Sequence, residues 1–264
     1  MLRIAVVLFV AATCTACLRS TTVVSIRPDG SGSIVQETGM SPQALAMLQG
    51  MSGSGEQKEK DAMPREIFGE DQARKIATQM GVTFVSGEPI KTAQLEGYRA
   101  RFSFEDVRKL QMKMNAEAAA AFSGGKNGTE PPFGFGFERR GASSLLTITM
   151  PQEKPAGLPG LGAGMGGGAG ANPEQNAQAV QMMKVMMQGL FVDISLDIDG
   201  RIIKTNAPHV AGSRLTLLQI DFDKLLADEA GLQKFQSASD LRGLSNIAGL
   251  KLPTEPKVTV EFAK

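Results

Sequence analysis

The two cysteines of the chain, Cys14 and Cys17, form a C-x-x-C motif, a spacing found in thioredoxin-like redox sites and in half of many zinc sites. A redox C-x-x-C lies between a strand and a helix of a compact domain. Here the motif instead follows an unbroken apolar stretch, residues 4–12, that begins directly after Arg3. A basic start, a short apolar core and a small-residue exit are typical of a secretory signal peptide. We therefore expect residues 1–16 to be a removable export signal, with no redox or metal chemistry at the cysteines.

The sequence Cys-Thr-Ala-Cys at residues 14–17 resembles a bacterial lipobox, in which small residues precede an obligatory cysteine. In such lipoproteins the cysteine thiol takes a diacylglycerol, the peptide is cut just before it, and the new amine is acylated. The resemblance therefore implies S-diacylglycerol and N-acyl groups on Cys17. Cys14 stands where the family prefers leucine, and cleavage before Cys14 is an alternative that leaves almost no exit region. Leu18, by resemblance to proteobacterial sorting, favours the outer membrane facing the periplasm if the source is Gram-negative.

The lipid also constrains where the folded part lies. Each buried CH₂ contributes about 0.8 kcal/mol, so one acyl chain holds a protein marginally and two or three hold it firmly. The first predicted strand begins about three residues after Cys17, a reach of at most about 10 Å. We therefore expect the domain to lie against the membrane surface with its first strand nearest the lipid.

Two glycine- or methionine-rich segments have residue types that bind cofactors elsewhere. Residues 162–167 match G-x-G-x-x-G, but the dinucleotide fingerprint requires a strand directly before it and a helix directly after it. Here the match lies in the Pro/Gly-rich stretch 151–172, where it arises by chance. Four methionines on a predicted helix could hold Cu(I), but without a histidine cluster nearby they fit a core or a partner surface better. These methionines are Met182, Met183, Met186 and Met187.

Three carboxylates cluster near a predicted turn, at Asp193, Asp197 and Asp199. A calcium-binding loop requires glycine at its sixth position and glutamate at its twelfth. Counted from Asp193, those positions are Ile198 and Lys204, so the calcium loop fails. The better interpretation is one solvated face of a strand.

The single histidine and a run of phenylalanines are the remaining candidates. His209 lies in a turn-rich connector, and no cysteine or G-x-S-x-G nucleophile accompanies it, so we interpret it as a loop residue. Phe133, Phe135 and Phe137 alternate with glycine. They fit a buried strand face better than an exposed contact stripe. We assign no catalytic, cofactor-binding or metal-binding residue.

Periodicity predicts the elements that position these residues. Strands are expected from alternating apolar residues and helices from apolar stripes with capping residues. The expected strands are 21–27, 33–38, 82–90, 94–104, 133–137, 146–150, 191–198, 201–206, 214–222 and 258–262. The expected helices begin at Ser41-Pro42 and cover 70–80 (ended by Gly81), 105–114, 173–189, 223–228 and 232–235.

The expected fold class is α+β, a mainly antiparallel sheet built of β-hairpins with helices packed on one face. Turn chemistry at 28–32 (PDGSG) and at Asp199-Gly200 predicts two of the hairpins. Residues 17–150 form the N-terminal part of this body, with flexible insertions at about 50–64 and 115–131. Residues 151–172 are a Pro/Gly-rich linker. The C-terminal part, 173–264, is a helix plus a hairpin.

Cys17, the adjoining strand and the 28–32 turn give the mature chain a resemblance to uncharacterised bacterial lipoproteins, including the LppM type. Residues 104–110 (FEDVRKL) and 200–207 (GRIIKTNA) have the look of such families. The resemblance implies an envelope role, names no activity and carries over no catalytic residue.

The charge distribution does not indicate nucleic-acid binding, because the chain has 28 basic and 27 acidic residues and no basic block. We therefore predict a lipid-anchored envelope protein of unknown activity, a non-catalytic binding or structural module. Its expected partners are the membrane, through the lipid, and an unknown envelope protein or lipid. The alternatives are an envelope enzyme without a recognisable motif and a lipid-binding carrier.

Overall fold

A computed structural model describes residues 18–46, 68–112, 133–151, 188–237, 242–244, 246–253 and 255–264. The export signal, both cysteines, the glycine motif and the four methionines of the predicted helix lie outside the described residues. The predicted insertions, the helix at 173–189 and nearly all of the predicted linker lie outside them as well.

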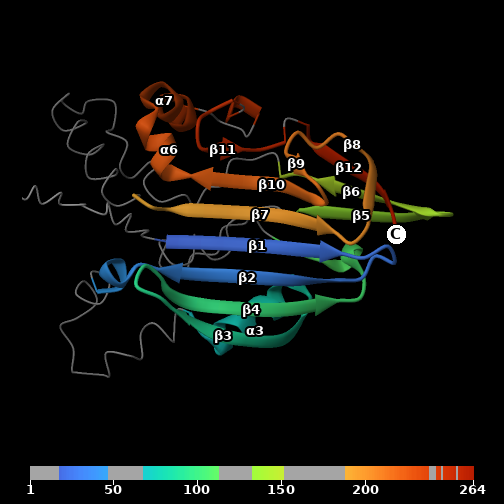
Figure 1. Cartoon of the computed structure of the whole chain (residues 1–264), viewed down its shortest axis with the longest axis horizontal. Coiled ribbons are helices and arrows are strands. Elements are labelled where there is room, and N and C mark those ends of the chain that lie inside the picture. The colour runs from blue at the N-terminus through green and yellow to red at the C-terminus, as the bar shows by residue number, and fades with distance from the viewer. Residues whose placement is uncertain are drawn as a thin grey trace, which may run out of the picture.

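Most of the described chain belongs to a large sheet, in the order β11-β10-β7-β1-β2-β4-β3, with β9 beside β10 (Figure 1). Neighbouring strands are antiparallel except for β1 and β7, which are parallel. The strands are β1 (Leu18–Ile26), β2 (Gly32–Met40), β3 (Thr83–Lys91), β4 (Glu96–Phe104), β7 (Phe191–Ile198), β9 (Val210–Ala211), β10 (Arg214–Asp221) and β11 (Leu250–Lys251). Strands from both sides of residues 151–172 thus pair at the centre of one sheet.

A second sheet of four strands has the order β5-β6-β12-β8. Its strands are β5 (Gly134–Arg140), β6 (Ser143–Thr149), β8 (Arg201–Thr205) and β12 (Lys257–Ala263). The hairpin predicted at Asp199-Gly200 is therefore wrong, because β7 belongs to the large sheet and β8 to the small one. Both edges of β7 are taken, by β1 and β10, so the returning chain has no edge to pair with. Gly200 is needed at this corner because an added Cβ would overlap the carbonyl oxygen of Ala263.

The helices are short. They are α3 (Glu70–Met80), α6 (Phe222–Ala227) and α7 (Glu229–Ser237), with 3₁₀ turns η1 (Val107–Lys109) and η2 (Arg242–Leu244). The bounds of α3 match the prediction, and Gly81 ends it in the left-handed region at φ 70°. Residues 42–46 form one helical turn, capped by Ser41, whose Oγ accepts a hydrogen bond from the Ala44 N–H at 3.1 Å. The helix predicted at 105–114 is wrong within the described residues, which form only η1.

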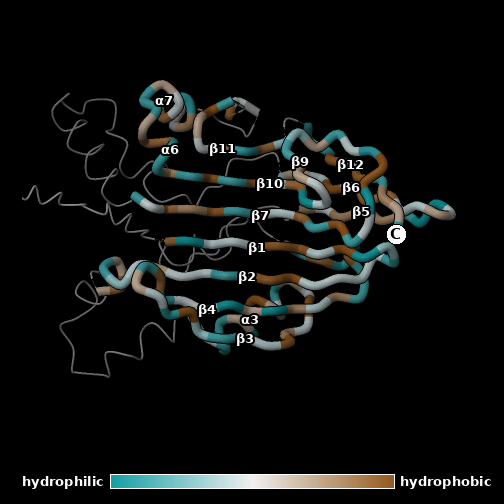
Figure 2. The backbone as a smooth tube through the Cα atoms, in the orientation of Figure 1, coloured by the Kyte–Doolittle hydropathy of each residue, from teal (hydrophilic) through white to brown (hydrophobic). Residues whose placement is uncertain are grey.

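Both sheets contribute to one hydrophobic core. Along β1 buried and more exposed positions alternate, and β7 and β10 follow the same pattern apart from the buried Ser195 and a bulge between Thr216 and Leu218, so about every second side chain faces that core. Figure 2 shows the hydropathy of the residues along these strands. Phe133 and Phe135 are buried and Phe137 packs half-buried against the core, which confirms the buried strand face. On α3 the apolar stripe is buried, and Arg74 lies over the Phe84 ring at 4.6 Å.

The structure is α+β as expected, but strands dominate it. The small sheet was not expected from the sequence. Its apolar residues and those of the helices are buried in the same core. Among the described residues no helix is long and apolar enough to cross a bilayer.

Candidate binding cleft at the ends of β1 and β7

The face of the large sheet opposite the core carries polar side chains in rows, because paired residues lie side by side across strands. One row lies near the end of the sheet where β1 finishes. It contains Ser103 of β4, Ser33 of β2, Ser25 of β1, Asp197 of β7 and Arg214 of β10. We call these five residues the serine row. Three hydroxyl groups therefore stand next to a carboxylate on four adjacent strands.

An open cleft of about 500 Å³ lies over the middle of the serine row. Its floor includes Ser25, Ser33 and Asp197, and its walls include Arg27, Asp199 and Ser213. The topology creates this cleft. The parallel strands β1 and β7 end side by side, and then β1 turns back into β2 while β7 leaves for the small sheet. Divergence at the carboxyl ends of adjacent parallel strands is a common place for ligand sites in open sheets.

Asp197 of the cleft has polar partners, whereas the hydroxyl groups of Ser25 and Ser33 have none among the described residues. Ser213 Oγ donates a hydrogen bond to Asp197 Oδ1 at 2.9 Å, and Arg214 Nη2 lies 3.9 Å from Asp197 Oδ2. The hydroxyl groups of Ser25 and Ser33 make no hydrogen bond to any described residue. They are half-buried and face the cleft.

Another row of the same face, nearer the start of β1, differs from the serine row because its polar side chains pair with one another. There Arg99 Nε donates to Glu37 Oε1 at 2.6 Å, and Arg99 Nη1 donates to Glu88 Oε1 at 2.8 Å. These polar groups satisfy each other across β2, β4 and β3. The unpaired hydroxyls of the cleft are therefore a local feature and not a general property of this face.

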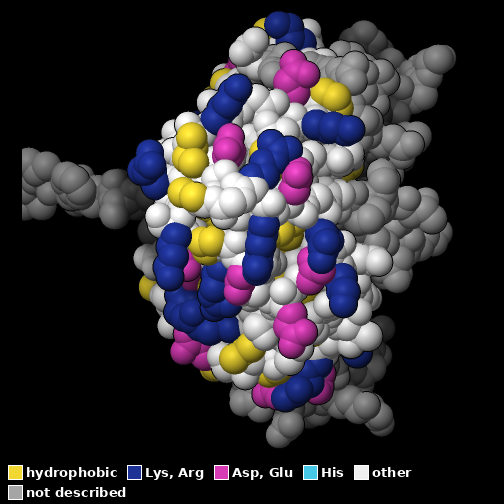
Figure 3. All heavy atoms as spheres, turned by 90° about the vertical axis from the view of Figure 1, so that its right-hand side faces the viewer, with side chains coloured by type: hydrophobic (Ala, Val, Ile, Leu, Met, Phe, Trp, Pro, Cys, Tyr) yellow, Lys and Arg dark blue, Asp and Glu magenta, His cyan; other side chains and the backbone are white. Residues whose placement is uncertain are grey.

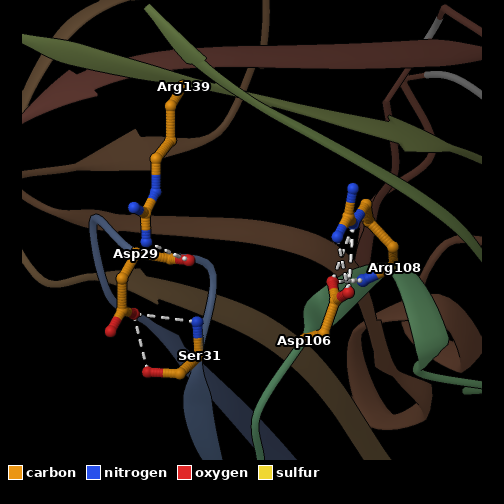
Figure 4. A network of polar contacts seen from close by, with 5 residues as sticks. All are labelled: Asp29, Ser31, Asp106, Arg108 and Arg139. Atoms are coloured by element: carbon orange, nitrogen blue, oxygen red, sulfur yellow. Dashed lines mark hydrogen bonds and ion pairs between the residues drawn. The ribbon is translucent and has the colours of Figure 1, made fainter. Parts of the chain in front are cut away.

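The turn that carries Arg27 is held firmly (Figure 4). Asp29 Oδ1 accepts hydrogen bonds from the Ser31 N–H at 2.9 Å and from Ser31 Oγ at 2.7 Å, and these bonds lower the pKa of Asp29. Arg139 Nη2 of the small sheet donates to the Asp29 carbonyl at 3.1 Å. Arg27 Nη1 donates to Ser31 Oγ at 3.1 Å. The wall of the cleft is thus tied to both sheets.

A second contact braces the same turn, since the Val107 N–H of η1 donates to the Gly30 carbonyl at 2.9 Å. Asp106 caps η1: its Oδ1 accepts a hydrogen bond from the Arg108 N–H at 3.0 Å, and the Arg108 guanidinium pairs with the carboxylate (Figure 4). Side-chain and then backbone hydrogen bonds from Arg108 lower the pKa of Asp106 to about 2.

The lowered pKa of Asp106 predicts an acid-dependent loss of stability. Because the native pKa of about 2 lies below the ordinary 3.8, the ionised carboxylate stabilises the native state above about pH 4. That contribution is lost as the pH falls from about 4 to about 2. An NMR titration of the Asp106 carboxyl carbon measures it directly. Arg108→Gln is expected to move the midpoint back toward 3.8, and an unchanged midpoint would contradict the role of Arg108.

The three aspartates have different surroundings. Asp197 and Asp199 line the cleft, but Asp193 lies two rows away, so the structure does not bring all three together. Asp193 is half-buried, and desolvation raises its pKa although the Ser195 hydroxyl, which donates to Oδ1 at 3.0 Å, acts in the opposite direction. The prediction of one solvated strand face is therefore wrong for Asp193. The described residues contain no group of three His, Cys, Asp or Glu side chains that could hold a metal ion.

His209 is a loop residue, as predicted. It precedes β9, and its carbonyl oxygen accepts a hydrogen bond from the Thr216 N–H at 2.9 Å. It does not line the cleft.

The sequence does not single out Ser25, Ser33, Ser213 and Arg27 as a group. Each is an ordinary strand or turn residue in the sequence, and only the pairing of β1 with β2 and β7 brings them together. Figure 3 looks onto this end of the molecule, where basic and acidic side chains are interspersed and hydrophobic ones are scattered. This end of the molecule is therefore polar and of mixed charge.

Comparison with known proteins adds one distant structural likeness. No family model matches the chain, and no curated protein matches it in sequence. Among solved structures, the NMR structure of the folded domain of LppM from Mycobacterium tuberculosis is similar with a TM-score of 0.34 and 10% sequence identity. The alignment covers 94% of this chain and 91% of that one. A likeness of this size establishes neither a shared fold nor a shared function.

Proposed function

We propose that the protein is a lipid-anchored, non-catalytic binding module of the bacterial envelope, held at the membrane through Cys17. The export signal and lipobox pattern at residues 1–17 support the anchor. The polar cleft supports binding. Such a module would use the cleft to bind another component of the cell envelope.

The observation that carries this proposal is the position of Leu18. This residue, next to Cys17, is the first residue of the central strand β1, is fully buried and pairs with Met40. We expected the strand to begin about three residues after the cysteine, but pairing with β2 extends β1 back to Leu18. A lipid on Cys17 would therefore be attached to the sheet with almost no slack.

That attachment fixes an orientation. Leu18, Met40, Glu96 and Lys91 form one row across four strands and would face the bilayer. Ser25 lies seven residues further along β1, or about 23 Å away at about 3.3 Å per residue. The cleft would then lie near the end of the sheet that is far from the membrane. A site in this position meets ligands of the aqueous envelope and not acyl chains.

The chemistry of the cleft favours binding over catalysis. Burial raises the pKa of Asp193, the kind of shift that a general acid or base uses, but Asp193 does not line the cleft. The carboxylate at the cleft floor, Asp197, is instead held by Ser213.

Depth measurements on the mature lipoprotein in liposomes test the proposal. A spin label at Lys91→Cys, whose native side chain is 81% exposed, should be relaxed strongly by paramagnetic lipid headgroups. A label at Arg140→Cys, the last residue of β5 in the small sheet, at the end of the molecule opposite the start of β1, should not be relaxed (Figure 1).

Mass spectrometry of the same preparation identifies the lipid on Cys17. An unmodified cysteine would refute the anchor. Equal relaxation at both labels would refute the fixed orientation while leaving the anchor in place, so the two parts of the proposal are tested separately.

A further inference from the structure

We propose that the cleft at the ends of β1 and β7 binds a neutral, hydroxyl-rich ligand, a short segment of glycan chain. The inference deepens the proposed function by naming the ligand class of the binding module. It uses the membrane orientation only to place that ligand on the outward side, and the chemistry of the cleft stands without the anchor.

The first reason is the pair of unpartnered hydroxyls on the floor. Ser25 and Ser33 lie opposite each other on β1 and β2, half-buried, with no hydrogen bond to any described residue. A serine hydroxyl donates one hydrogen bond and accepts others. Sugar hydroxyls have the same dual capacity, so a glycan can satisfy both serines at once. A ligand with acceptors alone would use only the donor capacity of the two serines.

The second reason is the charge balance of the lining. Asp197 and Asp199 disfavour an anionic ligand such as a phosphate ester, because like charges in contact repel. Arg27, which also lines the cleft, together with Arg214 near Asp197, disfavours a polycation. Carboxylates accept hydrogen bonds and guanidinium groups donate them. The lining therefore offers complementary polar contacts to a neutral ligand that both donates and accepts.

The third reason is the shape of the site. The cleft is open, and along the serine row it extends from Asp197 of β7 past Ser25 of β1 to Ser33 of β2. Adjacent strands lie about 4.8 Å apart, so this span is about 10 Å. An open groove of this length suits two linked sugar rings better than a compact single molecule. The turn that carries Arg27 is braced by Arg139 of the small sheet, so its wall needs no ordering when a ligand binds.

A titration of the full mature lipoprotein in detergent with chitotetraose, cellotetraose and maltotetraose tests the inference. Saturation-transfer NMR detects contact, and the fitted Kd for at least one oligosaccharide should be weak, about 0.1–1 mM, because the cleft is open and polar. The double variant Ser25→Ala/Ser33→Ala should bind about tenfold more weakly, since it removes two hydrogen bonds. Asp197→Asn, which keeps the shape and removes the charge, should weaken binding to a similar extent.

Ser103→Ala is the matched control, because Ser103 belongs to the serine row but does not line the cleft. It should change the Kd less than twofold. Binding of none of the three oligosaccharides would overturn the inference, as would equal weakening by Ser103→Ala and by the double variant. Tighter binding of inorganic pyrophosphate than of any oligosaccharide would assign the cleft to an anion instead. Because this assay does not depend on membrane attachment, its failure leaves the anchor proposal standing.

Discussion

Cys17→Ser is expected to abolish membrane attachment of the mature protein. Serine cannot form the thioether to diacylglycerol, so the chain would keep its export signal or be released without lipid. Each acyl CH₂ buried in the bilayer contributes about 0.8 kcal/mol, and the loss of two or three chains removes the whole of that attachment. Fractionation of cells followed by mass spectrometry of the N-terminus measures the result. The expected outcome is loss of the lipid-modified species from the membrane fraction.

Cys14→Ser is the matched control for this substitution. If cleavage occurs before Cys17, Cys14 leaves with the signal peptide, and its replacement should alter neither processing nor membrane attachment. The reverse pattern, in which Cys14→Ser prevents lipidation and Cys17→Ser does not, would assign the lipid to Cys14. In that case three residues, 15–17, would lie between the lipid-bearing Cys14 and Leu18, and the fixed orientation of the sheet would lose its support.

The local elements of this fold are predictable from the sequence because their signals are local. The stripe of α3 and its glycine C-cap, the alternation along β7 and the PDGSG turn after β1 each lie within a dozen residues. Pairing between distant strands has no such signal. The parallel pairing of β1 with β7 and the assignment of β8 to the small sheet depend on which edges remain free after the earlier strands have paired.

The Asp199-Gly200 pair illustrates the limit. Aspartate followed by glycine is favoured in two-residue hairpins because glycine tolerates unusual backbone angles. The same tolerance also suits a corner at which the backbone of Ala263 approaches Gly200 closely. The sequence alone does not distinguish these two uses of glycine.

The cleft was unpredictable for the same reason. Three of its residues, Ser25, Ser33 and Ser213, have no distinctive sequence context. The three aspartates that cluster in the sequence are separated in the structure, because Asp197 and Asp199 line the cleft whereas Asp193 is half-buried elsewhere. A site formed by cross-strand register becomes visible only when the register is known. Ligand sites on sheet faces are therefore harder to find from sequence than sites formed by contiguous motifs.

Gly32→Ala is expected to destabilise the large sheet strongly. Gly32 begins β2 and pairs with Ile26 on one side and Phe104 on the other. An added Cβ would overlap the carbonyl oxygen of Ser25 and the buried ring of Phe104. Neither can move away freely, because one belongs to the backbone of the central strand and the other to the packed core. We expect a loss of about 3 kcal/mol in the free energy of unfolding.

Thermal unfolding of the mature protein measures this effect, and a loss of that size lowers the Tm of a domain of this length by about 10 °C. Gly136→Ala is the matched control, since Gly136 is also a strand glycine, in β5. The nearest atom to its added Cβ would be Thr147 Cβ at 3.5 Å, an ordinary contact. This variant should be as stable as the native protein or gain up to about 1 kcal/mol, because alanine has less conformational freedom than glycine in the unfolded chain. Equal Tm values for the two variants would show that β1 and β2 do not pair in the register described, and the serine row would then lose the register on which it depends.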